Sequence, residues 1–166
     1  MVENEIHDDR GSLMHLFLIR HGESEEGKPD PKRALTAVGR KAAEEIARKV
    51  SDLPDKPDRL FSSPLLRARE TAAPFGQVWG LATEIADWLL PLTAPSQVMG
   101  ELTSLKASKV ALVGHLPHLG LLLSAFTQGL PAQEIVLPRG SVAFLKIKAW
   151  EPGGGKLQWL ISPEDR

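Results

Sequence analysis

The chain of 166 residues contains no cysteine, and its formal net charge is only −1, from 20 basic and 21 acidic side chains. The absence of cysteine excludes disulfide frameworks, thiolate nucleophiles and cysteine-ligated metal sites, and it is compatible with a reducing compartment. Because the charge is nearly balanced, the chain has no overall field that would attract nucleic acid or an anionic membrane. Any anion chemistry therefore has to come from a local cluster of side chains.

The sequence also has little that would direct it into or across a membrane. Its longest apolar stretch, residues 110–126, is interrupted by two histidines and a proline and falls short of a membrane span. The first residues, MVENEIHDDRGSL, are acidic and lack the basic and then apolar pattern of a secretory signal. We interpret residues 1–14 as a disordered leader, with Met14 as an alternative start, and expect a cytoplasmic protein.

What remains is an ordinary globular composition, with 42% hydrophobic and 25% charged residues. This composition excludes disordered, collagenous and fibrous classes. Because domains hold about 100–200 residues, the length predicts one domain, residues 15–166, which is long enough to bury a core. The sequence shows no internal repeat, low-complexity tract or linker.

Hydrophobic periodicity predicts strands that alternate with helices. Compact apolar runs predict buried strands at residues 16–19 and 59–61, within 81–90, and at 110–113. Apolar residues three or four positions apart predict amphipathic helices over about 36–53, 63–79, 96–105 and 118–126. Strands at 142–147 and 157–161 then flank a glycine-rich turn at 153–155. This order predicts a layered α/β domain with a mainly parallel sheet.

Two of these helices have clear start signals. Thr36 is the expected cap of the first helix, whose predicted apolar face consists of Val38, Ala42, Ile46, Val50 and Leu53. Ser63 and Pro64 are the expected cap and first residue of the second helix, whose predicted buried stripe is Leu65, Ala68, Ala72, Phe75 and Trp79. On this periodicity both Arg67 and Arg69 lie off the apolar stripe.

Unusual polar residues follow three of the predicted strands. Arg20-His21-Gly22 follows the first strand, Ser62-Ser63-Pro64 with Arg67 follows the second, and Gly114-His115 follows the fourth. The carboxyl ends of parallel strands meet at one edge of a sheet, where ligands bind in such folds. We therefore expect these three groups to converge.

Two histidines and two arginines at one sheet edge suit a dianion such as a phosphoryl group. Guanidinium groups bind phosphate oxygens bidentately and stay charged, and helix N-termini after Ser63 and near His118 would add backbone N–H donors. With no cysteine and no clear set of metal ligands, a histidine is the natural nucleophile. A neutral imidazole held at one nitrogen by a backbone carbonyl presents the lone pair of the other nitrogen for in-line attack. We expect neither a metal nor a cofactor.

The strings LFLIRHGES, RLFSSPLLRARETA and VALVGHLPHLG, in this order, resemble the conserved blocks of the histidine phosphatase superfamily (phosphoglycerate mutase-like, branch 1). The resemblance covers most of the chain from about Leu16 onward. It is closest to the short SixA-type phosphohistidine phosphatases, because PLT near Pro91, VGHLPHLG and LPRGSVAFLKI also match that subgroup. The resemblance implies a three-layer α/β/α sandwich with a mainly parallel central sheet.

The resemblance also implies roles for the converging residues. His21 would be the nucleophile that becomes transiently phosphorylated, and Arg20 and Arg67 would hold the phosphate oxygens. His115 would complete the phosphate pocket. His118, three residues further on, is expected to support the site rather than to contact the phosphate.

One functional side chain that is found in many members of the superfamily has no clear counterpart in this sequence. Many members supply a carboxylic acid after the third strand, but here ADWLLPLTAPSQ holds Asp87 upstream of PLT and no acid after it. Asp87, Glu84, Glu23 and solvent all remain open as proton donors. Because imidazole is a better leaving group than an alkoxide, this gap favours cleavage of N–P over O–P bonds.

The sequence thus predicts a metal-independent phosphatase that acts on phosphohistidine in a protein partner, which by the resemblance is a histidine phosphotransfer domain. The short chain leaves few residues to cover the pocket, which agrees with such a substrate. Two alternatives are a small-molecule phosphomonoesterase of the same fold and an inactive domain that binds phosphorylated partners. A mutase is disfavoured because the chain is short.

A nucleotide-binding P-loop is a further alternative, because residues 22–28 fit the pattern GxxxxGK after a strand. That motif needs Ser or Thr after the lysine, and a helix that begins there. This chain has Pro29 at that position, and its three loop glutamates would repel phosphates. The sequence therefore disfavours a P-loop.

Overall fold

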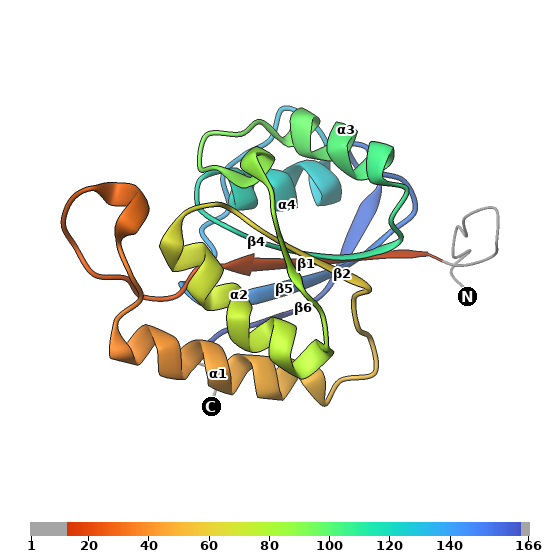
Figure 1. The fold of residues 1–166 in the computed structure, drawn as a ribbon. Helices are drawn as coiled ribbons and strands as arrows, with labels where there is room; N and C mark the ends of the chain where they lie inside the picture. Colours follow the sequence, from red (N-terminus) through yellow and green to blue (C-terminus); the bar gives the residue numbers. More distant parts are fainter. Residues whose placement is uncertain (1–12, 164–166) are drawn as a thin grey trace.

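The computed structural model describes residues 13–163, so residues 1–12 of the expected leader lie outside the described part (Figure 1). Its strands form one six-stranded sheet in the order β3-β2-β4-β1-β5-β6. The strands are β1 (Met14–Arg20), β2 (Arg59–Ser62), β3 (Thr83–Ile85), β4 (Lys109–Gly114), β5 (Val142–Ile147) and β6 (Gly155–Ile161). The first four run parallel, and β5 and β6 run antiparallel to their neighbours. The predicted, mainly parallel sheet is confirmed.

Within the described residues, four α-helices cover the two faces of this sheet. They are α1 (Ala37–Ser51), α2 (Leu66–Trp79), α3 (Pro95–Leu105) and α4 (His118–Gln128). Figure 1 shows α1 and α2 on one face and α3 and α4 on the other. Two short 3₁₀ turns, η1 (Asp30–Lys32) and η2 (Asp87–Leu89), lie in the loops after β1 and β3. The three-layer α/β/α sandwich that the resemblance implies is confirmed.

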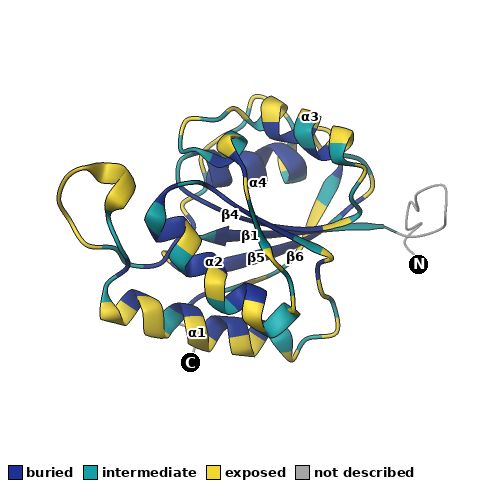
Figure 2. Cartoon of the chain, viewed as in Figure 1, coloured by how far each residue is buried: buried dark blue, intermediate teal, exposed yellow. Residues whose placement is uncertain are grey.

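Strand β1 lies at the centre because its side chains are apolar on both faces. Phe17 and Ile19 pack with α1 and α2, whereas Leu16 and Leu18 pack with α3 and α4. Successive side chains of a strand point to opposite faces. Because helices cover both faces, all four residues are fully buried. Burial of each stabilises the fold by about 1.5–3 kcal/mol. Figure 2 shows that most of β1 and β4 is buried between the helices.

The predicted apolar face of α1 is partly wrong. The predicted cap is present, since the Thr36 side chain accepts the Gly39 N–H. Val38, however, is 67% exposed, and the buried residues are Gly39, Ala43, Ile46, Ala47 and Val50. A Cβ atom on Gly39 would lie 2.2 Å from the Glu23 carbonyl oxygen. The helix therefore packs its glycine against the loop after β1, a contact that hydrophobic periodicity does not register.

The predicted start of α2 is also wrong. The helix begins at Leu66 and follows an extended Leu65, so Pro64 lies before it and Ser63 does not cap it. The Ser63 hydroxyl instead accepts the Leu65 N–H and lies beside the His115 ring. Arg67 is buried although it is off the predicted stripe, whereas Arg69 is exposed. Both differences reflect polar contacts at the sheet edge.

The other expectations about the core agree with the structure. Each tryptophan packs its ring against a phenylalanine, as expected for packing residues. The apolar stretch 110–126 divides into most of β4, a turn and most of α4. Within residues 13–163, the helices are too short or too polar to cross a membrane.

Candidate active site

The three polar segments meet at the carboxyl edge of β1, β2 and β4. The His21 N–H donates to the Gly114 carbonyl at 3.0 Å, and the Ser63 N–H donates to the Val113 carbonyl at 3.0 Å. These hydrogen bonds continue the ladders of parallel strands by one residue, which keeps the residues after the strands side by side. The rings of His21 and His115 lie with their centroids 5.1 Å apart. The structure therefore brings together the segments whose convergence the topology predicts.

The imidazole of His21 is fixed with one nitrogen free. Its Nδ1 lies 2.7 Å from the Gly22 carbonyl oxygen, and since a carbonyl only accepts, Nδ1 carries the hydrogen. Nε2 therefore holds a lone pair. Burial lowers the pKa of His21 to about 4, against the opposing hydrogen bond to Gly22, and nearby Arg67 and Arg20 lower it further. The ring is neutral at pH 7, as a nucleophilic imidazole must be.

The two arginines reach this edge from different elements. Arg20 ends β1, and its Nη1 donates to the Leu137 carbonyl at 2.7 Å, which ties it to the loop before β5. Arg67 lies in the first turn of α2 and is 5% exposed. Burial lowers the pKa of both guanidinium groups, but a guanidinium stays charged in proteins. Both are close enough to His21 to lower its pKa, so the site carries two positive charges.

Arg67 is held by the loop after β1. Its Nη1 donates to the Asp30 carbonyl at 3.1 Å, and its Nη2 lies 3.4 Å from Asp30 Oδ2. The other carboxylate oxygen of Asp30 accepts from Arg33 Nε at 2.9 Å. Thr71 adds a link, because its hydroxyl accepts the Gly22 N–H and donates to the Arg67 carbonyl. The nucleophile segment and Arg67 are thereby fixed relative to each other.

His115 is almost fully buried beside His21. Its Nε2 lies 2.7 Å from Ser63 Oγ, and its Nδ1 has no hydrogen-bond partner among residues 13–163. Burial, followed by the charges of His21 and Arg67, lowers the pKa of His115 to about 2. The ring is therefore neutral throughout the physiological range.

His118 packs behind the site. A Cβ atom on Gly114 would lie 2.5 Å from His118 Nε2, so the ring contacts the end of β4. Burial lowers its pKa to about 4, and the nearby Leu89 carbonyl opposes this shift. That carbonyl lies outside hydrogen-bonding geometry, and neither ring nitrogen has a partner within the described part of the chain. The position beside Gly114 agrees with a supporting rather than a substrate-contacting residue.

The three candidate proton donors differ in their surroundings. Glu84 forms a bidentate ion pair with Arg59, whose Nε and Nη2 donate to the two carboxylate oxygens at 3.0 and 2.6 Å. These hydrogen bonds lower the pKa of the Glu84 carboxyl. Glu23 accepts the Thr36 hydroxyl at 2.8 Å. Asp87 is exposed at the start of η2, directly after β3. Glu84 is thus ionised and engaged, and Asp87 is the carboxyl group next to the strand edge.

Two other expectations concern the loop after β1 and metal ligands. Residues 22–28 are followed by η1 and then by α1 from Ala37 onward, so the helix that a P-loop requires is absent there. Across residues 13–163, no three His, Asp or Glu side chains come together as metal ligands would.

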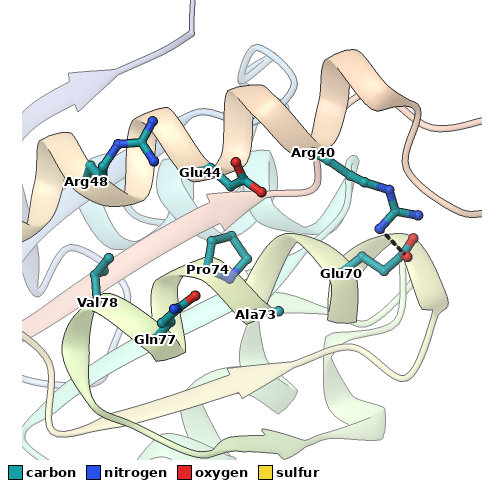
Figure 3. A pocket seen from close by; sticks show the side chains of 8 residues that line it. All are labelled: Arg40, Glu44, Arg48, Glu70, Ala73, Pro74, Gln77 and Val78. Carbon is teal, nitrogen blue, oxygen red and sulfur yellow. Dashed lines mark ion pairs between the residues drawn. The ribbon is translucent and has the colours of Figure 1, made fainter.

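A separate hollow of about 560 Å³ lies between α1 and α2 (Figure 3). Arg40 and Glu70 form an ion pair across it at 2.7 Å. The second oxygen of the Glu70 carboxylate accepts the Leu35 N–H at 2.8 Å. Because these contacts join α1 and the preceding loop to α2, we interpret this hollow as a structural feature.

Stability is expected to fall as the pH drops from 7 to 5. His21, His115 and His118 have a pKa of about 4, about 2 and about 4, against 6.5 in an unfolded chain. Below pH 6.5 the unfolded state therefore binds more protons, and the stability that is fully present above this pH is progressively lost. We expect Tm to fall by about 5–10 °C. Calorimetry at both pH values measures the change.

The control for this pH effect is the His118→Gln variant, which removes one of the three buried imidazoles. Its Tm should depend less steeply on pH than that of the wild type between pH 7 and 5. Carboxyl groups remain mostly ionised in this window, so they contribute little to the difference. An equal slope in both proteins contradicts the assignment.

Comparison with known proteins shows which family part of this chain resembles. The sequence profile of the histidine phosphatase superfamily (branch 1) matches residues 16–90. The Pgam5 protein of Drosophila yakuba, named a mitochondrial serine/threonine-protein phosphatase, is 41% identical over 59 residues, which are 35% of this chain and 20% of that protein. The match thus spans about a fifth of the length of this relative.

Solved structures resemble the chain over nearly its whole length. The protein histidine phosphatase SixA complexed with tungstate has a TM-score of 0.81 and 25% identity over 90% of this chain and 97% of that chain. A SixA protein from Agrobacterium tumefaciens has a TM-score of 0.75 and 23% identity over 90% and 98% of the two chains. The second likeness shows the fold alone.

The three-layer fold, with histidines and arginines at its sheet edge, therefore occurs in a chain that resembles known phosphatases in sequence and in structure. Residues 16–90 match the histidine phosphatase superfamily, and the chain is similar to SixA over nearly its whole length, as the sequence motifs predict.

Sequence reasoning missed Asp30 and Thr71, as well as the contact between Ser63 and His115. Asp30 lies among other charged residues of a loop, and Thr71 lies within a helix, so neither has a distinctive spacing. Ser63 belongs to one of the three segments that were expected to converge, but its hydroxyl was expected to cap a helix. The one available signal was the pair Ser62-Ser63 directly after a strand, where a hydroxyl can face a site.

Proposed function

We propose that this chain is a metal-independent phosphatase that works through a phosphohistidine intermediate on His21 and acts on phosphohistidine in a protein partner. The observation that carries the proposal is the His21 ring, which is neutral and fixed at Nδ1, leaves the lone pair of Nε2 available, and lies close enough to two guanidinium groups for both to lower its pKa. Arg20 and Arg67 hold the phosphoryl oxygens, and His115 contributes a neutral ring to the same pocket.

The reaction proceeds in two transfers of the phosphoryl group. His21 Nε2 attacks phosphorus in line, and the bond from phosphorus to the leaving nitrogen of the substrate breaks as the new N–P bond forms. The leaving imidazole takes a proton from solvent. Water then attacks phosphorus, loses a proton to solvent, and releases inorganic phosphate and neutral His21. The two arginines compensate the charge of the phosphoryl oxygens in both steps.

The leaving group is the reason for preferring phosphohistidine. An alkoxide needs a positioned acid, whereas imidazole can leave with a proton from solvent. Glu84 is ionised and bound to Arg59, so it supplies no proton. The likeness to the protein histidine phosphatase SixA supports the same substrate class. A histidine phosphotransfer domain is the partner that fits this chemistry.

The test compares phosphate release from a phosphorylated histidine phosphotransfer domain, a phosphoserine peptide and p-nitrophenyl phosphate. Each is measured with and without EDTA, in wild type and His21→Ala. We expect the phosphohistidine to react fastest, in a manner that needs His21 and is unaffected by EDTA. Faster release from p-nitrophenyl phosphate contradicts the substrate assignment, and release from none of the three supports a domain that only binds phosphorylated partners.

A phosphoserine or phosphothreonine protein is the second candidate substrate, because Asp87 is exposed at the end of β3 and Pgam5 is named a serine/threonine-protein phosphatase. On this alternative Asp87 donates the proton to the leaving oxygen. The phosphoserine peptide would then be the best substrate, and Asp87→Asn would slow its hydrolysis while leaving phosphohistidine hydrolysis unchanged.

A further inference from the structure

The hydroxyl of Ser63 occupies an unusual place beside the site. Ser63 is fully buried, its Oγ accepts the Leu65 N–H at 3.1 Å, and the same oxygen lies 2.7 Å from His115 Nε2. Neither contact serves the helix cap that a serine before a proline predicts. The hydroxyl links the backbone ahead of α2 to one nitrogen of a buried imidazole.

The hydrogen-bonding capacity of these groups decides where the protons lie. A serine hydroxyl donates one hydrogen bond, and a neutral imidazole has one donor and one acceptor nitrogen. If His115 Nε2 carried the hydrogen, the Ser63 hydroxyl would have to donate its hydrogen to another group. Among residues 13–163 no other acceptor forms a hydrogen bond with this hydroxyl. If Ser63 donates to Nε2 instead, the serine is satisfied and the ring hydrogen lies on Nδ1.

The second arrangement also suits an anionic ligand. Nδ1 has no partner among the described residues, and an N–H group that is buried without a partner costs about 1–3 kcal/mol. A phosphoryl oxygen on His21, whose ring centroid is 5.1 Å from that of His115, is an acceptor that this N–H can satisfy. A bare lone pair on Nδ1 would repel the same oxygen.

We infer that Ser63 is a positioning residue that fixes His115 as its Nδ1–H tautomer, so that a neutral ring donates a hydrogen bond to the transferred phosphoryl group. The inference rests on the proposed function for the role of the phosphoryl group, although the tautomer itself does not depend on activity. It makes the hydrogen bond from His115 independent of pH over the range in which the ring stays neutral.

The tautomer is measured by long-range ¹H–¹⁵N NMR of the full chain, labelled with ¹⁵N and recorded with and without inorganic phosphate. In wild type we expect His115 to show a protonated Nδ1 and an unprotonated Nε2, and its Nδ1–H signal to shift when phosphate binds. In Ser63→Ala we expect the Nε2–H form to appear. We expect kcat to fall about 10- to 100-fold, with a smaller change in KM, because the donor acts mainly on charge that develops in the transition state.

Ser62→Ala is the matched control. Ser62 is also fully buried, but its hydroxyl donates to the Ser63 carbonyl at 2.8 Å rather than to a histidine. We expect this variant to keep the wild-type tautomer and a kcat within about twofold of wild type. In a His115→Ala background, Ser63→Ala should have little further effect on kcat, because the two residues act together.

The outcomes separate this inference from the proposed function. A protonated Nε2 on His115 in wild type, or an unchanged tautomer in folded Ser63→Ala, overturns the role of Ser63 whatever the activity. A wild-type protein with the expected tautomer that releases no phosphate from any substrate overturns the proposed function and supports the assignment of the tautomer.

Discussion

Replacement of His21 by alanine should reduce phosphate release roughly 10⁴-fold or more, because the variant loses the nitrogen that we propose as the nucleophile. The Nε2 lone pair exists because the Gly22 carbonyl holds the hydrogen on Nδ1 at 2.7 Å and because burial keeps the ring neutral. Water attacking the substrate directly has no equivalent positioning. The rate of phosphate release from a phosphorylated histidine phosphotransfer domain, compared between wild type and variant, measures the loss of activity.

A second measurement on His21 detects the intermediate itself. When wild type is mixed with ³²P-labelled substrate and quenched in base, label should remain on the protein with the acid lability and base stability of phosphohistidine. His21→Ala should retain none. His115→Ala is expected to slow labelling without moving it to another residue.

His15→Gln is the matched control for the loss of a histidine. His15 lies near the start of β1, the strand that precedes His21, and so at the opposite end of that strand, where its Nδ1 is 3.9 Å from Asp55. We expect this variant to keep its activity within about twofold of wild type. If His21→Ala retained most of the activity, or if His15→Gln lost as much, the assignment of the nucleophile would be wrong.

The fold was predictable because its central strands are apolar on both faces. Continuous runs such as residues 16–19 and 110–113 are typical of buried parallel strands, and the helices between them leave few other topologies. The topology then places every residue that follows a strand at one edge. This is why Arg20, His21 and His115 could be grouped from the sequence before their contacts were known.

The polar contacts at that edge could not be predicted in the same way. Hydrophobic periodicity places Arg67 in solvent, yet Arg67 is buried because Asp30, from a loop distant in sequence, binds its guanidinium. The start of α2 is wrong for a related reason, since Ser63 is engaged with His115 rather than with the helix. Both contacts join side chains that are distant in sequence and meet only in the folded chain.

The glycine on α1 illustrates a different limit. Because Gly39 has no apolar side chain, hydrophobic periodicity predicts that Val38, rather than Gly39, lies on the buried face of the helix. Its lack of a side chain is nevertheless what allows the helix to approach the Glu23 backbone. Close approach of backbones is a steric property, and the apolar pattern of a single sequence does not encode it.

Replacement of Arg67 by methionine is expected to lower kcat/KM about 10²- to 10³-fold. The guanidinium is 5% exposed and carries a charge that lowers the pKa of His21. In the proposed mechanism, removing it leaves the phosphoryl oxygens without one of their two cationic partners. Arg67→Lys should recover only part of the activity, because an ammonium group cannot bind two oxygens as a planar fork does.

Arg69→Met is the matched control, since Arg69 is exposed on the same helix and its Nε donates to the Pro64 carbonyl at 3.1 Å. We expect this variant to retain the wild-type kcat/KM within about twofold. Equal losses in the two variants would indicate a general effect on α2 rather than loss of a phosphate ligand.

Full activity in Arg67→Lys would show that a single positive charge is sufficient, and would contradict bidentate binding by Arg67. The distinction matters because Asp30 already engages both terminal nitrogens of Arg67. The fork is therefore oriented before substrate arrives, and a lysine at this position would lack that orientation.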